Sequence, residues 1–487
     1  MLSKRQAGVL LHITSLPGPA TTGDISHHAY RFIEFLSQCG FGIWQLLPLG
    51  PTHSDSSPYQ CLSTHACSPD LISLEWLVDR GLLPNLPQSP RVIDSAFRAN
   101  CLRHAHENFQ KPIHTGMHAA FQEYKSKHTY WLHDYALFMA IRDHFNGAIW
   151  TTWEPSLRDR QAQALRKISI KLKNEIEYHQ FCQFVFYTQW AELRSYAHQH
   201  GVSLFGDLPI YVALDSADVW AHRDNFMLNS RAEPRYVAGV PPDAFSDTGQ
   251  RWGNPLYNWS HLKRSRFSWW VQRIRTQFEL FDILRIDHFR GLQAYWRIPA
   301  KDDTAENGKW VKAPGRQLLK TLHKQLGKLP LVAEDLGLIT EEVHALRHQF
   351  DLPGMYVLQF AFSGDPHNIY LPHNHQQNGV VYTGTHDNDT SLAWYESLSP
   401  EARHFLNRYL HCGEHPAMPE TLIRTTLASV ANTAILPMQD VLNLGIGHRM
   451  NTPATITGNW RWRFDWQQLD NRLIHHYRSQ LQLYGRI

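Results

Sequence analysis

The sequence has 487 residues, of which 43% are hydrophobic and 19% charged, and its net charge is +3. These values are typical of a globular protein with a sizeable core. Because no run of Lys or Arg stands out and no apolar run approaches membrane-spanning length, neither nucleic acid nor a membrane is indicated as a partner.

The six cysteines form no C-x-x-C pair and no Cys/His ligand cluster. We therefore expect reduced, structural thiols and a cytoplasmic protein. The apolar run near the amino terminus ends in polar residues and Pro17 without a small-residue cleavage site, which favours a first strand over a signal peptide.

The first half of the chain begins with a strand–helix–strand pattern. Residues 7–16 and 43–49 read as short buried strands, and the helical pattern between them ends at Gly40, a helix-terminating signal. Such a unit folds with parallel strands and a helical crossover. From about residue 70 to 200 no strong strand is visible, and the sequence predicts helices over 95–110, 128–146 and 158–200.

The strand pattern then resumes and continues to the end of the chain. The predicted strands lie within 202–212, 281–291, 329–337, 355–362, 379–390 and 434–442, with a helix around 259–279. About eight strands separated by helices predict an α/β fold, a single catalytic (β/α)8 TIM barrel over 1–487. We expect long, largely helical insertions on its C-terminal face, at 51–200 and 213–280, and no C-terminal β-domain.

The stretch FDILRIDHFRG, residues 281–291, places charged residues in a buried strand. Side chains alternate along a strand, so Ile283, Arg285 and Asp287 share one face. Burying a carboxylate beside a guanidinium fits either a structural ion pair or a nucleophile that its neighbour keeps ionised.

Four acidic residues lie at the C-terminal ends of predicted strands: Asp207, Asp287, Glu334 and Asp387. In a barrel these ends converge on the face that carries active sites, so we expect the four side chains to meet, with Arg285 and His386 beside them. Each acid alone could be a helix cap or a turn former. Gathered like charges raise one another's pKa, and such a cluster indicates chemistry or a metal.

The chemistry that this cluster favours is glycosyl transfer or hydrolysis, because the chain has no phosphate loop, no Cys nucleophile and no G-x-S-x-G motif. Arg285 should keep Asp287 ionised as a nucleophile. Glu334 follows an apolar strand and faces other acids, so its pKa should be raised, as a general acid requires. Together they predict a two-step retaining cycle in which Glu334 acts as acid and then as base.

The motifs RIDHFRG, AEDLG and GTHDND, in this order, resemble those of the α-amylase clan. The segment GVPPDAFSDTGQRWGNPLY (239–257) is similar to that of the 4-α-glucanotransferases, or amylomaltases, of glycoside hydrolase family 77. The resemblance covers essentially the whole chain and implies no cofactor and no metal. It implies Asp287 as nucleophile, Glu334 as acid/base and Asp387 as third carboxylate. It also implies substrate contacts by Tyr59, Asp207, Arg285 and His386, to which the 239–257 segment adds Asp243, Phe245, Trp252 and Asn254.

The 239–257 segment follows the third predicted strand, so it should overhang the mouth of the barrel. Pro241 and Pro242 stiffen it, and Phe245 and Trp252 offer apolar faces. A lid that binds the acceptor by stacking would keep water from a glycosyl-enzyme. The alternative is an ordinary long surface loop packed by its own aromatic residues.

Two positions depart from the family pattern. Ala244 stands where the family usually has Tyr, and Ser54 lacks an aromatic side chain that the family commonly carries. In relatives these aromatic residues are associated with acceptor contact and with a secondary glucan site. Acceptor preference and a separate glucan-binding groove are the properties that these two departures affect.

The leading hypothesis is a retaining α-1,4-glucan transferase. It would move maltooligosaccharide segments from an α-1,4-glucan to the 4-hydroxyl of glucose, maltose or another glucan. The alternatives are an α-1,4-glucan hydrolase of the same clan, a non-catalytic glucan-binding protein on the same barrel and a metal-dependent enzyme that binds Ca²⁺ or Mg²⁺ through its acids.

Overall fold

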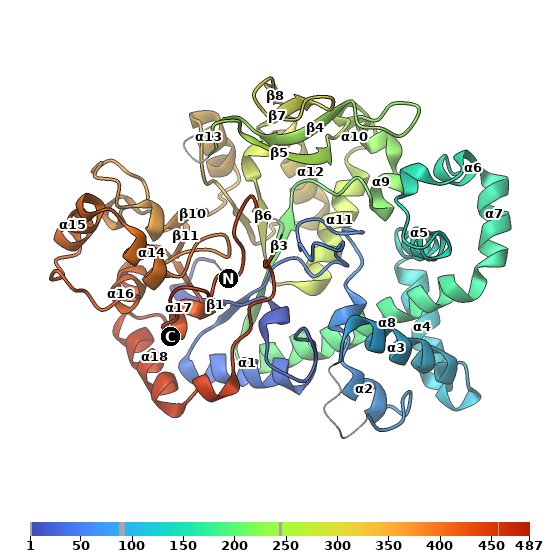
Figure 1. The fold of residues 1–487 in the computed structure, drawn as a ribbon, viewed down its shortest axis with the longest axis horizontal. Coiled ribbons are helices and arrows are strands. Elements are labelled where there is room, and N and C mark those ends of the chain that lie inside the picture. Colours follow the sequence, from blue (N-terminus) through green and yellow to red (C-terminus); the bar gives the residue numbers. More distant parts are fainter. Residues whose placement is uncertain (1, 87–92, 243–245, 456) are drawn as a thin grey trace.

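The computed structural model describes residues 2–86, 93–242, 246–455 and 457–487. Eight parallel strands form one sheet that wraps almost into a closed barrel, in the order β10-β11-β12-β1-β2-β3-β6-β9 (Figure 1). The (β/α)8 prediction is confirmed. The strands are β1 (Gln6–Leu10), β2 (Ile43–Gln45), β3 (Ser203–Pro209), β6 (Ile283–Asp287), β9 (Leu331–Ala333), β10 (Gly354–Val357), β11 (Gly379–Tyr382) and β12 (Thr433–Pro437).

The barrel strands are buried on both faces, which is why they read as continuous apolar runs in the sequence. Alternate residues of all eight strands pack together inside the barrel, among them Phe205, Ile283 and Val332. The residues between them, such as Leu204 and Leu284, belong to the larger core that includes the helices. Because Ile283 points inward, the alternation places Arg285 and Asp287 on the inner face as well.

The barrel closes between β9 and β10, the two end strands of the sheet. Here the Ala333 N–H donates to the Pro353 carbonyl at 2.9 Å. The side chain of Asp335 also joins the two strands, because its Oδ1 accepts the Met355 N–H at 2.8 Å. Asp335 is paired with Arg347 at 3.1 Å, so a buried ion pair supports this seam.

Helices surround the strands. The first, α1 (His27–Cys39), ends as predicted at Gly40, whose φ of 91° is left-handed and whose N–H bonds the Leu36 and Ser37 carbonyls. The helices that follow the later strands are α11 (Ser268–Leu280), α12 (Gly315–Leu326), α13 (Glu341–Gln349), α14 (Ser391–Ser397), α15 (Pro400–Tyr409), α16 (Glu420–Ala428), α17 (Met438–Val441) and α18 (Asn471–Leu483).

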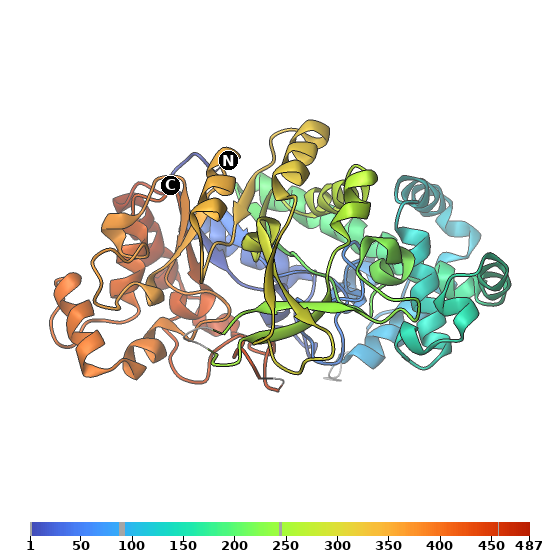
Figure 2. The same ribbon diagram turned by 90° about the horizontal axis from the view of Figure 1, so that it is seen from above.

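A helical region between β2 and β3, coloured blue through teal to green in Figure 1, extends to one side of the barrel and returns to it through its last helix (Figures 1 and 2). It contains α2 (Leu74–Asp79), α3 (Ser95–Phe109), α4 (Thr115–Lys127), α5 (Leu132–His144), α6 (Pro155–Arg158), α7 (Ala162–Lys171) and α8 (Lys173–Gln199). The helix predicted over 158–200 is therefore divided. The predicted helix at 259–279 is also divided, into α10 (Trp259–Arg264) and α11, because Arg266 and Phe267 are left-handed. The short helix α9 (Ala217–Ala221) follows β3.

A second sheet of four antiparallel strands lies at the top of Figure 1, in the order β5-β4-β7-β8. Its strands are β4 (Tyr236–Val240), β5 (Gln250–Pro255), β7 (Ala294–Pro299) and β8 (Lys309–Lys312). The expectation of a loop over 239–257 is wrong for the part that β4 and β5 occupy. Gly239 allows their close pairing, because a Cβ there would lie 2.1 Å from the Gln250 carbonyl oxygen.

Among the described residues, no helix is long and apolar enough to cross a membrane. All six cysteines are free thiols.

Candidate active site

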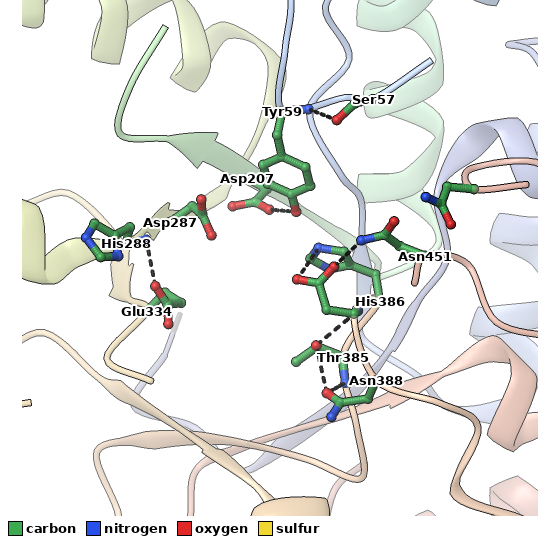
Figure 3. A network of polar contacts seen from close by, with 12 residues as sticks. Ser57, Tyr59, Asp207, Asp287, His288, Glu334, Thr385, His386, Asn388 and Asn451 are labelled. Carbon is green, nitrogen blue, oxygen red and sulfur yellow. Dashed lines mark hydrogen bonds and ion pairs between the residues drawn. The ribbon is translucent and has the colours of Figure 1, made fainter. Parts of the chain in front are cut away.

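The four acids named from the sequence come together at the carboxyl ends of the barrel strands, because Asp207, Glu334 and Asp387 all lie near enough to act on Asp287. Figure 3 shows Asp207, Asp287 and Glu334. Asp207 lies within β3, Asp287 ends β6, Glu334 directly follows β9 and Asp387 lies in the loop after β11. Figure 3 shows Tyr59 and His386 gathered around the same region.

Arg285 forms the centre of a buried network. Its Nε and Nη2 donate to the two carboxylate oxygens of Asp207 at 2.9 and 2.6 Å. The same Nη2 donates to Asp287 Oδ1 at 3.0 Å and to Tyr59 Oη at 3.2 Å. The Tyr59 hydroxyl in turn donates to Asp207 Oδ2 at 2.6 Å. Arg285 thus contacts Asp287, and its two-pronged partner is Asp207 on the neighbouring strand.

The pKa of Asp287 lies well above its usual range. Burial is the largest cause, and the carboxylates of Asp207, Glu334 and Asp387 add to it, whereas Arg285 lowers the pKa. Arg285 therefore favours the ionised form of Asp287, but desolvation outweighs the guanidinium. The side chain keeps 29% exposure, which leaves one part of the carboxylate accessible.

Burial raises the pKa of Glu334 to about 7, in the direction that a general acid requires. Two backbone groups fix its carboxylate: the His288 N–H donates to Oε2 at 2.6 Å, and the Leu336 N–H donates to Oε1 at 2.9 Å. His288 can make this contact because its backbone is left-handed, with φ 52° and ψ 49°. Nothing in the sequence signalled this role for His288.

Asp387 differs from the other two carboxylates. Burial raises its pKa, but His386, Asn451 and Arg285 lower it more, so the pKa of Asp387 lies below its usual range. His386 Nε2 lies 3.3 Å from Oδ2, and Asn451 Nδ2 donates to Oδ1 at 2.6 Å. Asn451 comes from the segment after α17, far along the chain, and sequence reasoning missed it.

Three aromatic rings pack beside these carboxylates. Tyr59 stacks on His386 with centroids 5.2 Å apart and planes 15° apart. Trp460, which sequence reasoning also missed, lies 6.0 Å from both rings. Stacked rings of this kind suit the apolar faces of sugars.

The residues of the 239–257 segment that the sequence assigned to substrate binding differ in their contacts. Trp252 meets the His288 ring edge to face at 4.8 Å. Asn254 is 5% exposed, and its Nδ2 donates to the Val212 carbonyl at 3.0 Å, so it has protein partners. Asp243, Ala244 and Phe245 lie outside the described residues.

Ser54, the other departure from the family pattern, is exposed in a turn. In the described parts of the chain, no group of three or more His, Cys, Asp or Glu residues is arranged to hold a metal ion.

A (β/α)8 barrel whose mouth gathers paired carboxylates, a guanidinium and stacked rings is typical of enzymes that act on glycosidic bonds. The family model described as 4-alpha-glucanotransferase, glycoside hydrolase family 77, matches residues 11–469. The chain therefore belongs to the 4-alpha-glucanotransferase family and is an enzyme of that class. The resemblance found in the sequence is confirmed.

Individual relatives agree with this assignment. The chain is 46% identical over 499 residues to a 4-alpha-glucanotransferase of Synechocystis, covering 100% of this chain and 99% of the relative. It is also 46% identical over 473 residues to the enzyme of Thermus thermophilus, covering 94% of each. Among solved structures, an amylomaltase from Streptococcus agalactiae in complex with acarbose matches with a TM-score of 0.94 and 38% identity, covering 99% of this chain and 100% of that one.

Proposed function

We propose that the enzyme is a retaining transferase that moves α-1,4-linked glucan segments through a covalent glycosyl ester of Asp287. The observation that carries the proposal is the position of Asp287 and Glu334 on paired strands. Ile286 is in register with Ala333, and the Glu334 N–H donates to the Ile286 carbonyl at 3.0 Å. The two carboxyl groups therefore leave the barrel side by side, as a nucleophile and its acid partner require.

In the first step, an Asp287 oxygen attacks the anomeric carbon of the donor while the glycosidic C–O bond breaks. Glu334 gives its proton to the departing oxygen, so the remainder of the donor leaves with a new hydroxyl group. A pKa of about 7 lets Glu334 hold that proton near neutral pH. The Arg285 contact favours the ionised form of Asp287 while Glu334 keeps the proton.

In the second step, ionised Glu334 takes the proton from the 4-hydroxyl of an acceptor. The acceptor oxygen attacks the anomeric carbon and releases Asp287 as a carboxylate. Two successive inversions leave an α-linkage. The low pKa of Asp387 keeps this residue charged throughout, which suits a group that accepts hydrogen bonds from sugar hydroxyls.

We assign the remaining residues to substrate binding. Tyr59 and His386 present stacked rings to the donor sugar, and the Asp207–Arg285 pair holds Tyr59 and Asp287 in place. The acarbose bound to the Streptococcus agalactiae amylomaltase supports an oligosaccharide-like ligand for this site. On the acceptor side we propose Trp252 and Asn254, together with Asp243 and Phe245 from the sequence motif.

The substrates that we propose are α-1,4-glucans and maltooligosaccharides, with glucose or maltose as acceptor. Incubation with maltotriose tests the transfer. A ladder of longer and shorter oligomers is expected, and shortening alone would identify a hydrolase instead. A protein that binds maltotriose without changing it would fit the non-catalytic alternative.

We also propose that residues 1–487 act as one catalytic unit, with 51–200 and 213–280 as insertions into the barrel. A cytoplasmic location remains a prediction, supported by the six free thiols. A thiol-reactive probe applied to the native source would test it, since oxidised cysteines would contradict that location.

A further inference from the structure

Loop 383–390, which follows β11, carries His386 and Asp387. Thr383 at its start and Ser391, the first residue of α14 directly after it, both donate to one buried carboxylate. Asp440 lies in α17, directly after β12, and is 1% exposed. Its Oδ2 accepts hydrogen bonds from the Thr383 hydroxyl at 2.5 Å and from the Ser391 hydroxyl at 2.6 Å. Its Oδ1 accepts the Ser391 N–H at 2.8 Å.

The surroundings of Asp440 are unusual for a buried acid. Within the described chain it forms no ion pair with Lys, Arg or His, and its hydrogen-bond donors are Thr383 and Ser391, on either side of the loop. Burial raises the pKa of Asp440, and the Ser391 and Thr383 donors lower it only in part. Burying an ionised carboxylate without a cation costs free energy of folding, and Asp440 has no ion pair that would offset this cost.

The same loop is held from the other side by Gln359, just after β10. Its Nε2 donates to the Asp389 carbonyl at 2.9 Å and to the Ser391 hydroxyl at 3.4 Å, and its N–H donates to the Thr383 carbonyl at 3.3 Å. Loop 383–390 is therefore clamped between the ends of both neighbouring strands. On the β12 side, Asp440 makes the hydrogen bonds to its ends.

We infer that Asp440 is a positioning residue for the reaction, acting through His386 and Asp387. Thr383 lies three positions before His386, so a shift of the loop end moves both site residues with it. Misplacement of catalytic groups by about 1 Å can lower a rate about 100-fold. The inference rests on the proposed function, because it assigns the reaction to the residues that the loop carries.

The test compares Asp440→Ala with Asp440→Asn in the full chain, by kcat and KM for maltotriose disproportionation well below each variant's Tm. Alanine removes every acceptor, so kcat should fall about 100-fold while KM changes little. Asparagine can accept the Ser391 N–H and donate to the two hydroxyls, so kcat of Asp440→Asn should be at least about tenfold higher than that of Asp440→Ala. A folded Asp440→Ala enzyme with wild-type kcat would overturn the inference.

A double variant separates positioning from general destabilisation. If Asp440 acts through the loop, the two substitutions should not be independent. The loss of kcat in the double variant Asp440→Ala/His386→Ala, relative to the wild type, should then be smaller than the product of the two single fold-losses. A fully multiplicative loss would contradict the inference. The control is Asp282→Asn, a buried acid just before β6 that accepts the Leu204 N–H at 2.8 Å and pairs with Arg194 at 2.6 Å. It should lower Tm without lowering kcat.

If Asp440→Ala does not fold, Ser391→Ala and Thr383→Val each remove one donor and should each lower kcat severalfold. Wild-type kcat in both would overturn the inference. A different variant tests the proposed function: Asp387→Asn at the wild-type rate would contradict it. If Asp387→Asn is inactive while Asp440→Ala keeps the wild-type kcat, only the role of Asp440 is rejected.

Discussion

Arg285 and Asp207 are direct partners in the parallel ladder of β3 and β6, and their side chains form a bidentate ion pair with contacts of 2.9 and 2.6 Å. The side chains of both residues are at most 5% exposed. Nη2, one of the two nitrogens in this pair, also contacts Asp287 and Tyr59, so a structural ion pair orients the proposed nucleophile.

Replacing Asp207 with Asn should therefore damage both stability and rate. It leaves the buried Arg285 charge without its main partner, which costs about 3–5 kcal/mol in the free energy of unfolding. Denaturant unfolding measures this loss. Lys328→Ala, which removes a 73% exposed partner of Asp351, should cost less than about 1 kcal/mol. Similar losses for the two variants would contradict the account.

The pH dependence of kcat/KM should follow Glu334 and Asp287. Glu334 must be protonated to act as the acid, so the rate should fall as pH rises through about 7. Asp287 must be ionised, and its raised pKa moves the acidic limb above the usual range of an aspartate. Initial rates over a pH series measure both limbs. A flat profile through neutral and mildly alkaline pH would count against Glu334 as the acid.

Trp252 packs against His288, whose N–H holds Glu334. Trp252→Ala should open this side of the site to water and raise the hydrolysed fraction severalfold relative to transfer. Counting new reducing ends against elongated products from maltotriose measures the ratio. Trp310→Ala, on β8 of the same antiparallel sheet, is the control and should leave the ratio unchanged. An unchanged ratio in Trp252→Ala would remove the proposed acceptor-side role.

Arg486 is 2% exposed and donates to backbone carbonyls at the bottom of the barrel, including those of Gln6 and Leu427. Arg486→Ala leaves several buried carbonyls unpaired and should lower the free energy of unfolding by more than about 3 kcal/mol. Thermal unfolding measures the effect, and kcat of the folded enzyme should not change. The control Arg478→Ala removes an exposed residue of α18. Equal losses in the free energy of unfolding for Arg486→Ala and Arg478→Ala would contradict this prediction.

The sequence was sufficient to predict the barrel because its strands are buried on both faces and separated by helices. The second sheet was missed because β4 and β5 are short strands, and because β4 also pairs with β7, more than 50 residues further along the chain. Long-range pairing of this kind leaves no periodic signal in either segment.

The four acids could be located because strand ends converge in a barrel. The partners of these acids could not be located in this way. The pairing of Arg285 with Asp207 depends on strand register, the Asn451 contact on the path of a segment 64 residues beyond Asp387, and the Glu334 contact on the left-handed backbone of His288. None of these properties is encoded in a local pattern of residue types.

The proposed mechanism requires that Asp287 becomes glycosylated. Incubating Glu334→Gln with an α-maltosyl fluoride, whose leaving group needs little acid assistance, should let the first step proceed and slow the second. Peptide mass spectrometry should then find one maltosyl group on the peptide that contains Asp287, and none when Asp287 is replaced by Asn. A maltosyl group on a different residue, or turnover of the fluoride by Asp287→Asn at the parent rate, would contradict the account.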